Sequence, residues 1–459
     1  MFELNNVITC ELRDQACLIF ETGIAAADPQ QSVKNILISG DYHLEILLSL
    51  TSGNPSRLGH WPLIHVLAFG KAACSMAKVA REIIPAEWFA GRGIAVTNYE
   101  NVVPVEGFDV YGAGHPLPDS AGLQAAQLIA DKAASAGRGE LVLTLISGGA
   151  SALLPAPMDG ITLEDKIQTT DLLLASGANI NQINCVRKHL SNLKGGRLAK
   201  LAAPADLHAI ILSDVIGDEV SAIASGPTVP DETTYTDAIK ILQHFKLWDA
   251  VPASVRSLFS AGQAGELPET PKASEKFFSN TFYTLCGSNR ISLNAIIKDA
   301  QARSFQSQVF NTHFSGEARK VAAQLAIYAQ QCWLTGVNSP IAILGGGEST
   351  VTLTGKGKGG RNQELALAFA LEAEKLEIPK CWVLLSGGTD GRDGPTTAAG
   401  GLIDGNTLTR IRAQGLNPEA LLHANDSYTA LNSANDLLET GATGTNVADL
   451  LILLMHPLA

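Results

Sequence analysis

At 459 residues the chain exceeds the length that one hydrophobic core usually serves, so we expect two domains. The formal net charge of −12, without a compensating basic stripe, argues against a nucleic-acid partner but not against small anionic ligands. No apolar run reaches the ~18 residues that span a bilayer, and the N-terminal residues lack the pattern of a signal peptide. We therefore expect a cytoplasmic protein without a membrane partner, whose seven scattered cysteines are reduced.

Predicted strands and helices alternate through the first half of the chain, after a mainly helical stretch that ends before residue 62. The expected strands cover residues 63–69, 93–97, the region around 110, 141–146 and 207–212, and the expected helices cover residues 72–83, 121–136 and 185–201. This order predicts an α/β fold with a Rossmann-like parallel sheet covered by helices on both faces. Ligands should bind at the carboxyl ends of its strands.

A change of composition between residues 247 and 279 predicts a domain junction, because Pro, Gly, Ser, Ala and Glu replace the periodic apolar pattern there. We expect an N-terminal Rossmann-like domain over residues 1–255 and a C-terminal α/β domain over residues 280–459. The strands expected in the second domain cover residues 281–286, 308–310, 341–344 and 381–385, and its helices cover residues 292–302 and 317–331.

Three predicted strands end in glycine clusters. Residues 141–146 lead into 147–151, residues 341–344 lead into 345–350, and residues 381–385 lead into 386–390. Glycine lets backbone N–H groups converge on an anion, although a single cluster of this kind more often only ends a strand. Three clusters with hydroxyl or carboxylate side chains favour anion cradles that serve several phosphates.

A series of short motifs resembles the class II glycerate kinase family, whose members end in a MOFRL domain and are often mislabelled hydroxypyruvate reductase. The resemblance extends from about Lys71 to Leu453. The motifs are GKAA at 70–73, GAGHPLPD at 112–119, ISGGASAL at 146–153, VRKHLS at 186–191, KGGR at 194–197, LSDVIGDE at 212–219, IASGPT at 223–228, GKGGRNQE at 357–364, GGTDGRDGPT at 387–396 and GTNVAD at 444–449.

The resemblance implies ATP-dependent phosphorylation of D-glycerate, usually at the 2-hydroxyl, with Mg2+ and with an active-site cleft between two α/β domains. It implies Lys71, Asp214 and Arg361 as catalytic residues, and it leaves a homodimer as one option for the assembly. The expected nucleotide-binding residues are His115, Ser147, Gly148, Gly149, Ser151, Lys194 and Gly388, and the expected metal ligands are Asp214, Asp218 and Asp390.

The chemistry of the three catalytic candidates can also be argued from their positions. Lys71 precedes a predicted helix, where a cation is disfavoured unless an anion binds beside it. Asp214 follows a buried strand and could accept the substrate proton, hold Mg2+ or only cap a turn. Arg361 could grip a carboxylate or phosphate with two hydrogen bonds, or pair with Glu364 on its own helix.

Three alternative functions remain open from the sequence. An NAD(P)H-dependent hydroxypyruvate reductase would share the βαβ order, but the G-x-G-x-x-G fingerprint is absent after the first strand. A glycerate kinase that forms 3-phosphoglycerate would carry the same motifs. A non-catalytic sugar-acid sensor is disfavoured, because a sensor needs no carboxylate near a transferring phosphoryl group.

Overall fold

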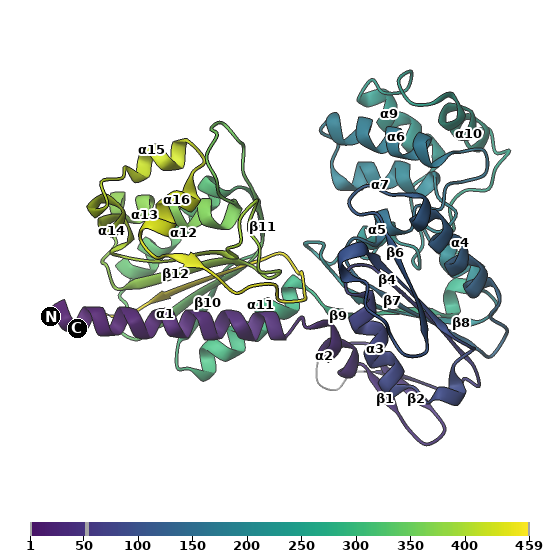
Figure 1. Ribbon diagram of the computed structural model, residues 1–459, viewed down its shortest axis with the longest axis horizontal. Helices are drawn as coiled ribbons and strands as arrows, with labels where there is room; N and C mark the ends of the chain where they lie inside the picture. Colours follow the sequence, from purple (N-terminus) through teal and green to yellow (C-terminus); the bar gives the residue numbers. More distant parts are fainter. Residues whose placement is uncertain (1, 51–54, 458–459) are drawn as a thin grey trace. The chain divides into compact units, whose positions relative to one another are not determined.

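The computed structural model describes residues 2–50 and 55–457 of the chain, in two compact units (Figure 1). The N-terminal unit contains Pro29–Ser213 and Asp218–Cys286, and the C-terminal unit contains Met1–Asp28, Asp214–Gly217 and Gly287–Ala459. This division differs from the domains predicted at residues 1–255 and 280–459. The first helix belongs with the C-terminal unit, and residues up to 286 belong with the N-terminal unit.

The main sheet of the N-terminal unit has the strand order β6-β5-β4-β7-β8-β9. Its strands are β4 (Ile64–Phe69), β5 (Gly93–Asn98), β6 (Phe108–Ala113), β7 (Leu141–Ile146), β8 (Asp206–Leu212) and β9 (Thr281–Gly287). The pairs from β6 to β8 are parallel, and every residue of β4, β5 and β7 is buried, so both faces of the sheet are covered. The α/β fold predicted for this region is confirmed.

Strand order reverses between β4 and β7 in this sheet. The chain moves from β4 to β5 and β6 on one side, then returns to β7 on the other side of β4 and continues to β8. Ligands of open α/β sheets bind outside the carboxyl ends of the strands at such a switch point. We therefore expect a ligand site of this unit at the loops after β4 and β7.

Helices and a small antiparallel sheet complete the N-terminal unit. The helices are α2 (Pro29–Lys34), α3 (Ala73–Ile83), α4 (Ser120–Ala134), α5 (Ala150–Leu153), α6 (Leu163–Ala175), α7 (Ile180–His189), α8 (Arg197–Ala202), α9 (Tyr235–His244) and α10 (Ala253–Gln263). The small sheet contains β1 (Leu37–Ser39), β2 (Leu44–Leu47) and β3 (Ser56–Gly59), so the prediction of mainly helical structure before residue 62 is wrong beyond α2. Helices α6, α7, α9 and α10 share one apolar core, which is visible as a helical cluster in Figure 1.

Three sequence predictions about this unit need correction. The helix expected at 185–201 is two helices, because Gly195 and Gly196 between them adopt left-handed φ values of 56° and 81°. The segment taken as a junction contains α10, which packs into the core of the helical cluster. Strand β9, expected in the second domain, lies beside β8 in the first sheet.

The C-terminal unit is built on a mixed sheet of order β10-β11-β15-β12-β13-β14. Its strands are β10 (Gln306–Glu317), β11 (Ile341–Thr350), β12 (Trp382–Gly388), β13 (Gly400–Asp404), β14 (Leu437–Leu438) and β15 (Asp449–Met455). Its helices are α1 (Phe2–Ala25), α11 (Asn289–Ala302), α12 (Ala318–Leu334), α13 (Arg361–Lys375), α14 (Thr407–Ala413), α15 (Pro418–His423) and α16 (Ser427–Ser433). The expected second α/β domain is thus present.

Strand β15 explains why this sheet needs helices on both faces. Its residues alternate between two cores: Leu451 and Leu453 pack with α12 and α13, while Leu450 and Ile452 pack with α1 and α11. A strand with apolar side chains on both faces stays out of water only between two helical layers.

Within the described residues, no helix has the length and apolar character that a membrane span requires.

Candidate active site

The loops after β4 and β7 are hydrogen-bonded to each other at the switch point. The Lys71 N–H donates to the Gly148 carbonyl at 2.9 Å, and the Ala72 N–H donates to Ser147 Oγ at 3.0 Å. Gly70 has a left-handed φ of 122°, and a Cβ there would lie 2.3 Å from Ser147 Oγ. Only glycine permits this approach, so the sequence of the first loop fixes its position against the second.

The same place brings Lys71, His115 and Gly149 together. A Cβ on Gly149 would lie 3.1 Å from His115 Nε2 and 3.2 Å from Lys71 Cγ. Lys71 is exposed, and its ammonium has no hydrogen bond or ion pair within the described residues. Burial and the nearby Lys71 charge both lower the pKa of His115, so its imidazole is neutral at pH 7. The structure thus assembles a cation, a neutral histidine and a glycine turn at one sheet edge.

Lys194 lies close to the end of this loop and is 3% exposed. Its Nζ donates to the Ser151 carbonyl at 3.1 Å, and Ser151 Oγ is 3.1 Å from Ser225 Oγ. Burial, with repulsion from Arg187, lowers the pKa of Lys194 to about 7. Six of the expected nucleotide-binding residues therefore fall in one region of the N-terminal unit, the seventh, Gly388, being elsewhere.

The other two glycine clusters are not anion cradles, and that prediction is wrong. Strand β11 continues to Thr350, and its Gly345 and Gly347 pair with strands on both sides. Strand β12 continues through Gly388, whose N–H donates to the Ala399 carbonyl at 2.9 Å. Backbone N–H groups that complete a β-ladder are not available to a phosphate.

Arg361 begins α13 and is held by two carboxylates of its own unit. Its Nε and Nη2 donate to the two Asp449 oxygens at 2.7 and 2.9 Å, and its Nη1 donates to Glu348 at 2.5 Å. The alternative ion pair with Glu364 does not form, because Glu364 pairs with Arg319 at 2.8 Å. Burial raises the pKa of Asp449 to about 6 despite the opposing charge of Arg361.

The N-terminus of α13 carries its own carboxylate. Asp393 accepts the N–H groups of Asn362 and Gln363 at 3.1 and 2.8 Å, and it is buried. These are the orphan donors to which an anion would otherwise bind. The end of the helix is therefore already occupied by a carboxylate of the protein itself.

The three expected metal ligands are less closely defined. Asp214 and Asp218 lie in the loop after β8, and the half-buried Asp390 accepts the Arg392 N–H at 3.0 Å. Among the described residues, no group of three or more histidine, cysteine, aspartate or glutamate side chains could hold a metal ion. The metal assignment stays a prediction.

Sequence reasoning missed Asp449, Arg187 and Lys166. Asp449 was only the last letter of a motif, yet it is the one charged residue of the apolar strand β15, and a carboxylate there needs a partner. Arg187 and Lys166 carried no signal of their own, because burial of a lysine or arginine is not visible in a sequence. Their burial becomes apparent only in the packed helical cluster.

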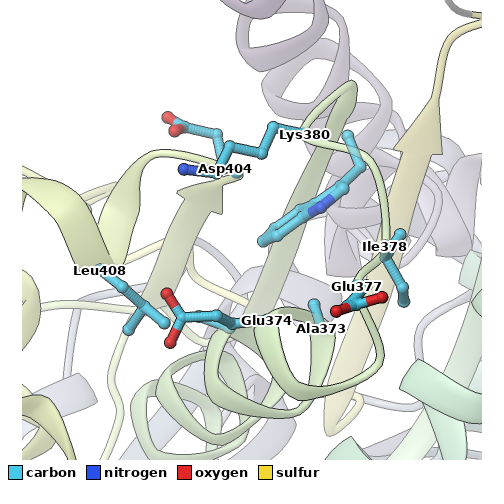
Figure 2. A pocket seen from close by; sticks show the side chains of 10 residues that line it. Ala373, Glu374, Glu377, Ile378, Lys380, Asp404 and Leu408 are labelled. Carbon is cyan, nitrogen blue, oxygen red and sulfur yellow. The ribbon is translucent and has the colours of Figure 1, made fainter.

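A small cavity of about 160 Å³ lies at the far end of α13 from Arg361 (Figure 2). Glu374, Lys380, Asp404 and Leu408 are among the side chains that line it. It includes none of the predicted site residues, and its volume is below the ~300 Å³ at which substrate pockets usually begin.

Comparisons with known proteins identify both halves of the chain. Residues 15–260 match a family described as a domain of unknown function (DUF4147), and residues 341–449 match the MOFRL family. The chain is 39% identical to a glycerate 2-kinase of Pyrococcus horikoshii over 97% of this chain and 98% of that protein. It is 38% identical to an Agrobacterium vitis protein whose name proposes a hydroxypyruvate reductase, over 95% and 93% of the two chains.

A solved structure supports the same relationship. The crystal structure of a glycerate kinase from Thermotoga maritima matches with a TM-score of 0.84 and 36% identity, covering 97% of this chain and 99% of that one. These matches agree with the ordered motifs and with both sheets. The chain belongs to the class II glycerate kinase family, whose members join a DUF4147 domain to a MOFRL domain.

Proposed function

We infer that this protein is an ATP-dependent kinase that phosphorylates D-glycerate to 2-phosphoglycerate. The observation that carries the inference is the match over nearly the whole chain to a glycerate 2-kinase at 39% identity. The reductase alternative is disfavoured, because the loop after β4 lacks the glycine pattern that binds a dinucleotide. Phosphoryl transfer instead needs cations, and Lys71 at the switch point can supply one.

In the N-terminal unit, we assign Lys71 to the neutralisation of phosphoryl charge. Its ammonium is exposed and unpartnered within the described residues, two positions before α3 begins. His115, as a neutral imidazole, can accept a hydrogen bond from the nucleotide or donate one to it without adding charge. Ser147, Gly148, Gly149, Ser151 and Lys194 are the further nucleotide-binding residues that we propose, and Gly388 is no longer one of them.

In the C-terminal unit, we assign Arg361 to the binding of a carboxylate or phosphoryl oxygen. A guanidinium has five N–H donors, and Asp449 and Glu348 occupy three of them. The remaining donors belong to Nη1 and Nη2, and the side chain is 32% exposed. Asp449 thereby orients Arg361, and two N–H donors are left for a ligand.

The metal that kinase chemistry implies fits the chemistry of the expected donors. Mg2+ prefers carboxylate oxygens, and with a nucleotide bound it needs only one or two from the protein. One or two of the proposed ligands Asp214, Asp218 and Asp390 would hold it, and the ion would neutralise charge on the phosphates. Asp214 has the second proposed role of accepting the proton of the glycerate hydroxyl.

A coupled assay with ATP, Mg2+ and D-glycerate tests the proposed function, and phosphorus NMR of the product identifies the phosphorylated hydroxyl. We expect ADP to form and the product to be 2-phosphoglycerate. A parallel assay follows NADH with hydroxypyruvate. Steady NADH oxidation without ADP formation would establish the reductase instead, and a 3-phosphoglycerate signal would correct the regiochemistry.

A further inference from the structure

Among the described residues, two buried lysines and a half-buried arginine of the N-terminal unit have no acidic partner. Lys166 and Lys194 are 5% and 3% exposed, and each ammonium donates to a backbone carbonyl, that of Pro155 and that of Ser151. Arg187 has no hydrogen bond or ion pair within the described residues. We call these residues the cation cluster.

A neighbouring cation, by contrast, is paired with a carboxylate. Lys188, which follows Arg187 on α7, forms a buried ion pair with Asp231 at 3.2 Å. Within the described residues the cation cluster lacks such a partner, and an unpaired charge away from water is among the costliest features a protein can hold.

The members of the cation cluster also repel one another. Burial first, and then the charges of Lys194 and Arg187, lower the pKa of Lys166 well below its ordinary value. Burial and the charge of Arg187 also lower the pKa of Lys194. An anion bound between these groups would relieve both effects at once.

The surrounding polar groups are held in place for a ligand. A chain of hydrogen bonds joins Ser151 Oγ to Ser225 Oγ and Ser225 Oγ to Asn184, which lies one turn before Arg187 on α7. Ser225 and the preceding Ala224 have left-handed φ values of 61° and 52°, a strain that usually marks a functional site. The Gly195 N–H donates to the Ser225 carbonyl at 3.0 Å, which fixes the strained turn against the loop that carries Lys194.

We infer that Lys166, Arg187 and Lys194, together with the hydroxyls of Ser151 and Ser225, form a buried site for phosphate oxygens of the nucleotide. The inference rests on the proposed kinase function. Ser151 ends the glycine loop of the switch point, so a phosphate chain that begins at this loop reaches the cluster next. Three cations match the charge of a polyphosphate, whereas glycerate carries one negative charge.

Isothermal titration with inorganic pyrophosphate and with ADP tests this site without turnover. Arg187→Gln should weaken both ligands about tenfold or more, because a charge-assisted hydrogen bond to phosphate contributes about 1.5–3 kcal/mol. The KM for D-glycerate should change less than about twofold. Lys200→Gln, an exposed cation at the end of α8, is the matched control and should bind like the wild type.

Thermal unfolding gives a second measurement, the rise in Tm when pyrophosphate is added. A purely structural role of the cation cluster would not change this rise. Pyrophosphate should raise the Tm of the wild type and of Lys200→Gln, and this shift should be lost in Arg187→Gln and in Lys166→Met. Circular dichroism confirms that each variant is folded. Should Arg187→Gln fail to fold, Lys166→Met decides.

If the folded Arg187→Gln or Lys166→Met variant binds pyrophosphate as tightly as the wild type does, the inference is overturned. A raised glycerate KM with unchanged pyrophosphate affinity also overturns it, because the cluster then binds the substrate carboxylate. An equal loss of affinity for pyrophosphate and for D-glycerate does the same, since the effect is then not specific to phosphate. A wild type that binds pyrophosphate through Arg187 but forms no phosphoglycerate would refute the proposed function alone.

Discussion

Arg361 shows how a single side chain can be both anchored and available. Two carboxylates of the C-terminal unit fix the plane of its guanidinium, and two N–H groups stay open. The sequence correctly predicts that Arg361 opens a helix after Gly359 and Gly360. It does not predict the partner, because Asp449 lies 88 residues away in the chain and meets Arg361 only through the sheet.

Replacement of Arg361 by lysine should keep the charge but lose the planar fork. We expect kcat/KM for D-glycerate to fall about a hundredfold, because the single nitrogen of a lysine lacks the planar fork that bonds both Asp449 oxygens and still presents fixed donors to a ligand. Steady-state kinetics measure the loss, with the surface variant Arg412→Lys as control. Near wild-type kinetics in Arg361→Lys would make Arg361 a structural residue.

Asp449 should impose a pH dependence on stability. Its pKa is about 6 in the folded protein against an ordinary value of 3.8, so the folded state holds this proton more tightly than the unfolded state. The stabilisation is complete below about pH 4 and is lost as the pH rises through about 6. Urea unfolding from pH 4 to 7 should show this loss in the wild type but not in Asp449→Asn. Parallel curves for the two proteins would contradict the raised pKa.

Asp214→Asn separates the two roles that we propose for this residue. We expect kcat to fall roughly a hundredfold with little change in the KM for glycerate, as for a group that acts in the transition state. Rescue by higher Mg2+ would identify a metal ligand, whereas loss of the acidic limb of the pH–rate profile would identify the base. Full activity combined with a lower Tm would make Asp214 a turn residue and direct attention to Asp218 and Asp390.

At the scale of elements, one glycine cluster of three ends its strand, while the other two do not. The cluster after β7 is a loop because β7 ends at a helix, and Gly149 with a φ of 82° makes the turn. The clusters in β11 and β12 continue as strands because β15 lies between them and pairs with both. Local composition could not reveal this, since the pairing depends on a strand some 100 residues further along the chain for β11.

Gly347→Ala tests whether the second cluster serves packing. A Cβ at Gly347 would lie 2.2 Å from the Phe314 carbonyl oxygen, which is backbone of the adjacent strand and cannot move aside cheaply. We expect the free energy of unfolding to fall by about 1–3 kcal/mol with the KM for ATP unchanged. In Gly137→Ala, the control, the new Cβ makes only ordinary contact at 3.6 Å. Unchanged urea stability with a raised KM for ATP would restore the anion cradle.

At the scale of the whole molecule, the sequence predicts two α/β units but misplaces their boundaries. Periodicity identifies α1 as a packing helix, yet nothing local shows that it packs on the second sheet. The link is a charged network in which Arg13 of α1 and Arg410 of α14 share the buried carboxylates of Asp404 and Asp436. Composition cannot reveal that α1 belongs to the C-terminal unit while the residues that follow it form the N-terminal unit.

This network predicts that α1 stabilises the C-terminal unit through Arg13. In Arg13→Gln, Asp404 and Asp436, which are 3% and 1% exposed, keep Arg410 as their one cationic partner in the described part of the chain. We expect the free energy of unfolding to fall by about 2–3 kcal/mol, since buried carboxylates that lose a cation are costly.

The matched control is Arg412→Gln, which breaks exposed ion pairs with Glu374 and Glu419 and should cost about 1 kcal/mol or less. Urea unfolding of both variants, followed by circular dichroism, measures the difference. Arg13→Gln removes a positive charge from two buried carboxylates. The loss of unfolding free energy that it causes should therefore be smaller, and closer to that of Arg412→Gln, in a protein that also carries Asp436→Asn, because the asparagine is neutral. Equal losses in Arg13→Gln and Arg412→Gln would show that α1 is held by apolar packing alone.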